Sequence, residues 1–129
     1  MATTRQASFA SPTQKAEDIL RRAAKVDADT TAIAVSGGTD SIYAAYLTAK
    51  LGPELGIEPD VVVHANTGAA IPQTRLVARA IAEMLDCRYK EGNNGTLGPR
   101  VLSRGWPAGT IQGHYFEYIE RKSDVFDAV

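Results

Sequence analysis

Six consecutive residues between two apolar runs combine the residue types that hold phosphate groups. They are Ser36, Gly37, Gly38, Thr39, Asp40 and Ser41. The two glycines permit positive φ angles and carry no Cβ, so successive backbone N–H groups can converge on an anion. The three hydroxyl groups add neutral donors. This segment, the 36–41 segment below, is therefore predicted to bind phosphate.

Asp40 is the exception in this segment, because a carboxylate repels phosphate unless a cation lies between the two groups. Two roles fit it: a ligand of Mg²⁺ bound together with a nucleotide, and a cap for the helix that follows. The simpler alternative for the whole segment is a tight turn in which Ser36 or Asp40 only caps that helix. The density of glycines and hydroxyls favours phosphate binding.

The flanking runs indicate how the 36–41 segment is held. Residues 31–35 are largely β-branched and predict a strand, and residues 42–51 predict a helix that Gly52 and Pro53 end. A loop between a strand and a helix amino terminus places its N–H groups at the positive end of the helix dipole. The P-loop and dinucleotide-binding patterns are excluded, because neither the Gly-Lys-Ser/Thr ending nor three spaced glycines are present.

Two further helices are predicted on either side of this unit. Ser11 and Gln14 form a capping box around Pro12, and apolar residues at helical spacing follow through position 26. A later helix begins at Pro72. Its apolar stripe, predicted to lie in the core, consists of Leu76, Val77, Ala80, Ile81 and Met84.

Residues 60–65, with three consecutive valines, predict a strand buried on both faces, and a short strand is predicted near residues 87–90. Helices and strands thus alternate, which predicts an α/β three-layer sandwich around a parallel sheet of about three strands. Asn66, Thr67 and Gly68 follow the second strand. Because ligands bind at the carboxyl ends of parallel strands, this turn and the 36–41 segment are expected to share one pocket. Asn66 or the Gly68 backbone would contact the adenine or ribose; the alternative is a simple strand-to-helix turn.

Composition limits the remaining function classes. The chain has 129 residues, 14 basic and 15 acidic, and a formal charge of −1, so no broad basic surface indicates nucleic-acid binding. No apolar run approaches the ~20 residues that span a bilayer, and a cytoplasmic protein is expected. The single cysteine, Cys87, excludes an internal disulfide and an iron–sulfur cluster within this chain, and it is predicted to be a buried, inert thiol.

Domain boundaries follow from the same patterns. Residues 1–10 are predicted to form a flexible arm, and residues 11–129 a single domain. Within it, residues 99–104 predict one or two helical turns and residues 112–122 a further helix. His114, at the start of that helix, is interpreted as a capping or packing residue in preference to a catalyst.

The 36–41 segment resembles the PP-loop, Ser-Gly-Gly-x-Asp-Ser, of the adenine nucleotide α-hydrolase-like superfamily, which includes ATP pyrophosphatases, adenylating amidotransferases and phosphoadenosine phosphosulfate (PAPS) reductases. Residues 64–68 and 71–75 resemble a PAPS reductase region in which an (Asp/Asn)-Thr-Gly…Pro-(Glu/Gln)-Thr run lies beside the nucleotide. Gly105, Trp106 and Pro107, with residues 114–122, resemble a Gly-aromatic-Pro segment and helix of archaeal and phage PAPS reductase-like proteins. The resemblance covers residues 28–122.

The departures from this family carry their own implications. Family members continue through two more strands and an arginine-bearing loop, and PAPS reductases carry a late nucleophilic cysteine; neither feature is found in this sequence. The resemblance therefore implies a member truncated at its C-terminus, a fragment, or a protein that completes its sheet with a partner or a second copy.

The resemblance implies an adenine-nucleotide-binding domain. Its ligand would be PAPS, adenosine phosphosulfate or ATP, with Mg²⁺ at Asp40 in the ATP case. The leading interpretation is a PAPS reductase-like protein of sulfonucleotide reduction or sulfur transfer. The alternatives are an AMP-forming ATP pyrophosphatase-type enzyme and a non-catalytic binding or assembly subunit.

Overall fold

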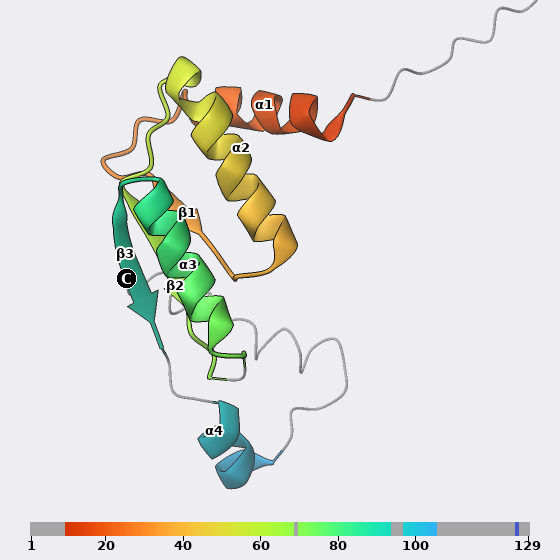
Figure 1. The fold of residues 1–129 in the computed structure, drawn as a ribbon, viewed down its shortest axis with the longest axis vertical. Helices are drawn as coiled ribbons and strands as arrows, with labels where there is room; N and C mark the ends of the chain where they lie inside the picture. Colours follow the sequence, from red (N-terminus) through yellow and green to blue (C-terminus); the bar gives the residue numbers. More distant parts are fainter. Residues whose placement is uncertain (1–9, 69, 94–96, 106–125, 127–129) are drawn as a thin grey trace, which may run out of the picture.

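The computed structural model describes residues 10–68, 70–93, 97–105 and 126, and within them the chain folds as an α/β unit (Figure 1). The elements in chain order are α1 (Pro12–Ala23), β1 (Ala32–Ala34), α2 (Thr39–Leu55), β2 (Val61–Ala65), α3 (Gln73–Met84), β3 (Arg88–Gly92) and α4 (Leu97–Arg104). The α/β class predicted from the sequence is confirmed. No helix among these elements is long and apolar enough to cross a membrane.

The three strands form a parallel sheet in the order β1-β2-β3. In this register Ile33 lies beside Val62, and Val62 lies beside Tyr89. The central strand is the most buried one, as its unbroken valine run predicts, and Val62 has no exposed surface. Since all three strands run the same way, their carboxyl ends meet at one edge of the sheet.

Helices α2 and α3 share one hydrophobic core with the sheet. Its buried members are Val35, Ala45, Val62, Ala78, Ile81 and Ala82. The connections from β1 to β2 and from β2 to β3 are right-handed crossovers. Because both step across the sheet in the same direction, they place α2 and α3 on the same face of the sheet. Helix α1 packs against α2 (Figure 1).

Helix α1 begins where the sequence predicts. The Ser11 hydroxyl accepts a hydrogen bond from the Gln14 N–H at 3.2 Å, and the Gln14 side chain accepts one from the Ser11 N–H at 2.8 Å. The predicted capping box around Pro12 is therefore confirmed.

The prediction that Gly52 and Pro53 end the second helix is wrong, because α2 continues to Leu55. The helix ends instead at Gly56, which has a φ of 77°, and the Ile57 N–H donates to the Gly52 carbonyl at 2.9 Å. This is the left-handed glycine termination common at helix ends.

The apolar stripe predicted for α3 is only partly correct. Ala78, Ile81 and Ala82 are buried, but Leu76 is 63% exposed and Met84 is 82% exposed. Residues 76, 80 and 84 lie on a face adjacent to the buried one, and the sheet covers only the latter. The sequence pattern predicted the helix correctly but placed its buried face about one residue away from the face that is buried in the structure.

Helix α4 begins at Leu97, two residues before the predicted start, and ends at Arg104 as predicted. It lies beyond the carboxyl end of the sheet (Figure 1). The predicted arm, except for Ala10, and the predicted helix at 112–122 with Trp106, Pro107 and His114 lie outside the described residues.

Candidate functional site

The 36–41 segment connects β1 to α2 at the carboxyl edge of the sheet. The irregular connection predicted for residues 36–41, between a parallel strand and a helix amino terminus, is confirmed for residues 36–38 and is wrong for residues 39–41, which belong to α2. Gly37 adopts a φ of 88°, and Gly38 is the extended N-cap residue, with a φ of −83° and a ψ of 162°. Thr39, Asp40 and Ser41 therefore form the first helical turn.

This first turn presents unpaired backbone donors. The first intrahelical bond runs from the Ile42 N–H to the Gly38 carbonyl at 3.1 Å. In the described part of the chain, no backbone acceptor pairs with the N–H groups of Thr39, Asp40 and Ser41. Such groups at a helix amino terminus, at the positive end of the dipole, form an anion-binding position.

Two hydroxyls hold the segment in shape. The Ser36 hydroxyl accepts from the Gly38 N–H at 3.3 Å and donates to the Ser41 hydroxyl at 3.2 Å. Ser41 in turn donates to the Gly38 carbonyl at 2.9 Å. Both serines therefore organise the backbone that would receive the anion.

Gly37 lies against the start of α3. A Cβ added at Gly37 would overlap the Thr74 methyl group and would lie 3.0 Å from the Thr74 Cβ. Both the positive φ and this close approach require glycine. The contact places the 36–41 segment directly beside the segment that follows β2.

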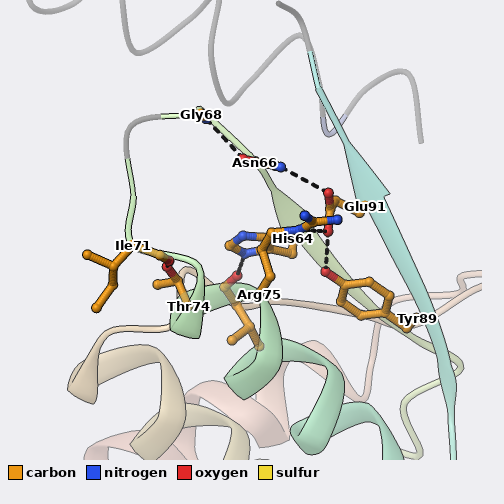
Figure 2. A network of polar contacts seen from close by, with 9 residues as sticks. His64, Asn66, Gly68, Ile71, Thr74, Arg75, Tyr89 and Glu91 are labelled. Atoms are coloured by element: carbon orange, nitrogen blue, oxygen red, sulfur yellow. Dashed lines mark hydrogen bonds and ion pairs between the residues drawn. The ribbon is translucent and has the colours of Figure 1, made fainter. Parts of the chain in front are cut away.

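The turn after β2 is organised by Asn66 (Figure 2). Its Oδ1 accepts from the Gly68 N–H at 2.9 Å, its Nδ2 donates to Glu91 Oε1 at 3.0 Å, and its backbone N–H donates to the Gly92 carbonyl at 2.9 Å. Gly68 has a φ of 72°. Both polar atoms of the Asn66 side chain thus have protein partners, so Asn66 holds the turn in its observed shape.

Glu91 is a residue of this site that the sequence interpretation did not identify. Its Oε2 accepts from Arg75 Nε at 2.9 Å and from the Tyr89 hydroxyl at 2.8 Å (Figure 2). Burial alone would raise the pKa of this carboxyl group, but the hydrogen bonds from Arg75, Tyr89 and Asn66 outweigh burial and lower the pKa to about 2. Its position in the sequence could have identified Glu91 as a site residue, because an acidic residue at the carboxyl end of a strand lies at the edge where ligands bind.

A cavity of about 270 Å³ opens between the two turns. Its lining includes Ser36 and Ser41 from the first turn, Thr67 and Ala70 from the second, and His64 between them. The predicted shared pocket is therefore present. Thr39 and Asp40 are exposed and are not part of this lining.

Metal binding by side chains alone has little support in the described residues, where no group of three or more His, Cys, Asp or Glu side chains is clustered. Asp40 provides a single exposed carboxylate in the first turn of α2. One carboxylate fits a Mg²⁺ ion whose remaining oxygen ligands come from a nucleotide and water.

Cys87 lies at the opposite edge of the sheet, between α3 and the start of β3. It is partly buried against the core, and burial raises the pKa of its thiol. The predicted burial of this cysteine is therefore only partial. Its location separates it from the cavity, and a raised pKa disfavours the nucleophilic thiolate.

Comparison with known proteins identifies the fold but no family. No protein-family model and no curated protein matches the sequence. Among solved structures, the chain is similar to the NH3-dependent NAD synthetase from Campylobacter jejuni subsp. jejuni NCTC 11168 in complex with the nitrate ion, with a TM-score of 0.60 and 19% sequence identity. The similarity covers 90% of this chain and 49% of that one, so the chain spans about half the length of its structural neighbour. The likeness supports the predicted α/β fold around a parallel sheet.

Proposed function

We propose that the 36–41 segment binds the phosphate groups of an adenine nucleotide. The observation that carries this proposal is the set of unpaired N–H groups at the start of α2, beside a cavity lined by the Ser36 and Ser41 hydroxyls. An anion there meets several donors and the positive end of a 17-residue helix. The nucleotide-binding residues are Ser36, Gly37, Gly38, Thr39, Asp40, Ser41, Thr67 and Gly68, with Asn66 holding the second turn in place.

Two arguments favour an adenine nucleotide over inorganic phosphate. The cavity extends from the phosphate-binding turn to the turn after β2, so it has room for groups attached to the phosphate. The structural neighbour is named as a synthetase of NAD, a dinucleotide that contains adenosine.

The sequence resemblance leads us to propose PAPS as the first ligand and sulfonucleotide chemistry as the first reaction class. Reduction of PAPS by thiol attack on its sulfur requires a thiolate near the cavity. Cys87, the chain's single cysteine, lies at the other edge of the sheet, so that thiol would come from a partner or from further sequence.

The second candidate is binding of ATP for AMP-forming chemistry, and the exposed Asp40 carboxylate in the first turn of α2, a position that fits Mg²⁺ held together with ATP, favours it. In that case Mg²⁺ would lie between the nucleotide and Asp40 and would neutralise charge on the pyrophosphate leaving group. The described residues would bind and orient the phosphates through the N–H groups of the first turn of α2. A binding subunit without catalysis would use the same contacts.

Calorimetry with ATP, PAPS and adenosine phosphosulfate, each with and without Mg²⁺, tests the proposal. Gly38→Ala is the informative variant, because Gly38 has a negative φ and an added Cβ would meet only the Ser36 hydroxyl, at 3.6 Å. The variant is expected to fold normally but to place a methyl group where the phosphate approaches, with at least a tenfold loss of affinity, about 1.4 kcal/mol.

The matched control is Gly56→Ala, at the distant end of α2, which is expected to leave affinity unchanged. Unchanged affinity in the folded Gly38→Ala variant, or no binding of any of the three nucleotides to the wild-type protein, contradicts the proposal.

A further inference from the structure

His64 has a defined tautomer at the base of the cavity. The residue is only 2% exposed, and its Nδ1 lies 2.7 Å from the Val35 carbonyl oxygen (Figure 2). A carbonyl oxygen only accepts hydrogen bonds, so Nδ1 carries the proton. In the neutral ring, this leaves a lone pair on Nε2.

The Nε2 lone pair is the notable polar feature of the cavity floor. His64 lines the cavity together with Ser36, Ser41 and Thr67, and among the described residues none donates a hydrogen bond to Nε2. The neighbouring Arg75 is paired through its Nε with Glu91, and that carboxylate also accepts from Tyr89 and Asn66. Because His64 lines the cavity, this acceptor is a position for a hydrogen-bond donor of a ligand.

The chemistry of an acceptor restricts what lies against it. Phosphate oxygens are themselves acceptors and are repelled by a lone pair, so the phosphate belongs on the N–H groups of α2 and not on His64. The ring is hydrogen-bonded to the residue immediately before Ser36, so Nε2 stands next to the phosphate-binding turn. In a nucleotide, the donors nearest the phosphates are the ribose hydroxyls.

We propose that His64 Nε2 accepts a hydrogen bond from a ribose hydroxyl of the bound nucleotide, which makes His64 a specificity-determining residue for the nucleoside half. This inference rests on the proposed nucleotide binding. The Nδ1–H bond to Val35 fixes the orientation of the ring in the wall of the cavity. A nucleotide would thus be bound at the ends of two strands, with its phosphate after β1 and its ribose at the end of β2.

The test compares ATP, 2′-deoxy-ATP, 3′-deoxy-ATP and tripolyphosphate on the wild-type chain and on His64→Asn. The asparagine Nδ2 can replace Nδ1 as donor to Val35, whereas no atom replaces Nε2. For the wild-type protein, one deoxy analogue is expected to bind about threefold to tenfold more weakly than ATP, the worth of one neutral hydrogen bond. In His64→Asn, the affinity for ATP is expected to fall by the same factor. The affinity for that deoxy analogue should fall no further, and the affinity for tripolyphosphate should be unchanged.

His114→Asn, which changes the other histidine of the chain, is the matched control and is expected to bind like the wild type. Should His64→Asn fail to fold, ¹⁵N NMR of the wild-type imidazole decides: the Nε2 signal should shift on addition of ATP and not of tripolyphosphate. Equal binding of ATP and both deoxy analogues, or an unmoved Nε2 signal at saturating ATP, overturns the role of His64 while nucleotide binding stands. Absence of ATP binding also overturns it, whereas the proposed function fails only if PAPS and adenosine phosphosulfate do not bind either.

Discussion

At the residue scale, the glycine at position 37 is required for two separable reasons. Gly37→Ala places a Cβ at a positive φ, which costs about 1–2 kcal/mol, and against the Thr74 methyl group, which costs about 1–3 kcal/mol more. We expect a loss of unfolding free energy near the sum of the two, measured by urea denaturation.

The control for this prediction is Gly56→Ala, which has a similar φ of 77° but no atom within 4 Å of the added Cβ. It should show only the backbone cost. Adding Thr74→Ser to Gly37→Ala removes the methyl group and should recover part of the difference, since the Cβ and Cα of residue 74 remain 3.0 and 3.1 Å from the added Cβ. A loss in Gly37→Ala no larger than that in Gly56→Ala would argue against the steric contact.

Glu91 makes stability depend on pH. Its pKa is about 2 in the folded chain against an ordinary value of 4.5, so the folded state favours the ionised form. The resulting stabilisation is complete above pH 4.5 and is lost as the pH falls towards 2. We expect Glu91→Gln to lower the unfolding free energy by about 1 kcal/mol at pH 7, since Arg75 is half exposed and its pairing is weakened by solvent.

Denaturant titrations of wild type and Glu91→Gln from pH 7 to pH 3 measure this effect, with Glu83→Gln on the exposed side of α3 as the control. The two unfolding free energies should converge as the pH falls. A difference that stays constant across this range would show that the Glu91 charge is not responsible.

At the element scale, α2 shows how packing reverses a helix preference. Alanine is favoured over glycine inside helices by about 1 kcal/mol. At Gly52, however, an added Cβ would lie 2.6 Å from the Ile57 carbonyl oxygen, which belongs to the backbone of the helix termination. We therefore expect Gly52→Ala to destabilise the fold by about 1–3 kcal/mol in thermal or urea unfolding.

Gly98→Ala in α4 is the matched change, because no atom lies within 4 Å of its added Cβ. It should be neutral or slightly stabilising. If both variants were stabilising, the close approach of Ile57 to Gly52 would be excluded.

The helices and strands also show which features of the fold a periodic sequence pattern can predict. Alternating helix and strand patterns were enough to predict the parallel sheet, and the capping residues around Pro12 were enough to predict the start of α1. The end of α2 was not predictable from Gly52 and Pro53, since the termination depends on the left-handed Gly56 four residues later. The exposure of the Met84 side chain was not predicted either, because a stripe of apolar residues does not specify which part of the stripe the sheet covers.

At the scale of the whole molecule, β1 forms one edge of the sheet that the described strands build. Among the described strands it has β2 as its only neighbour. Because the Val35 N–H donates to the Val63 carbonyl, alternation directs the Ala34 N–H away from β2. Unpaired strand edges associate with other strands, so we expect the chain to self-associate as its concentration rises, measured by sedimentation velocity.

Ala32→Lys adds a charge to this edge at an exposed position and should shift the protein towards monomer. Ala80→Lys, also exposed but on α3, is the control and should associate like the wild type. A wild-type chain that stays monomeric at all concentrations would contradict the prediction.

The parts of the site that depend on neighbouring residues in the sequence could be predicted from it. The 36–41 segment and the turn at Asn66 were placed correctly at one edge, because glycine, hydroxyl and strand patterns are local features. The partners of Asn66 were not predictable, since Glu91 approaches it from a different strand. The role of His64 likewise depends on Val35, which lies in another strand-to-helix connection.

The contact between Gly37 and Thr74 has a consequence for how sequences related to this one can diverge. Position 37 can accept a side chain only if position 74 gives up its γ-methyl group, because the two atoms would occupy the same space. A mutation at either position thus changes which residues are permitted at the other. Homologues that keep this geometry are expected to vary together at these two positions, with threonine or valine at 74 only where glycine is retained at 37.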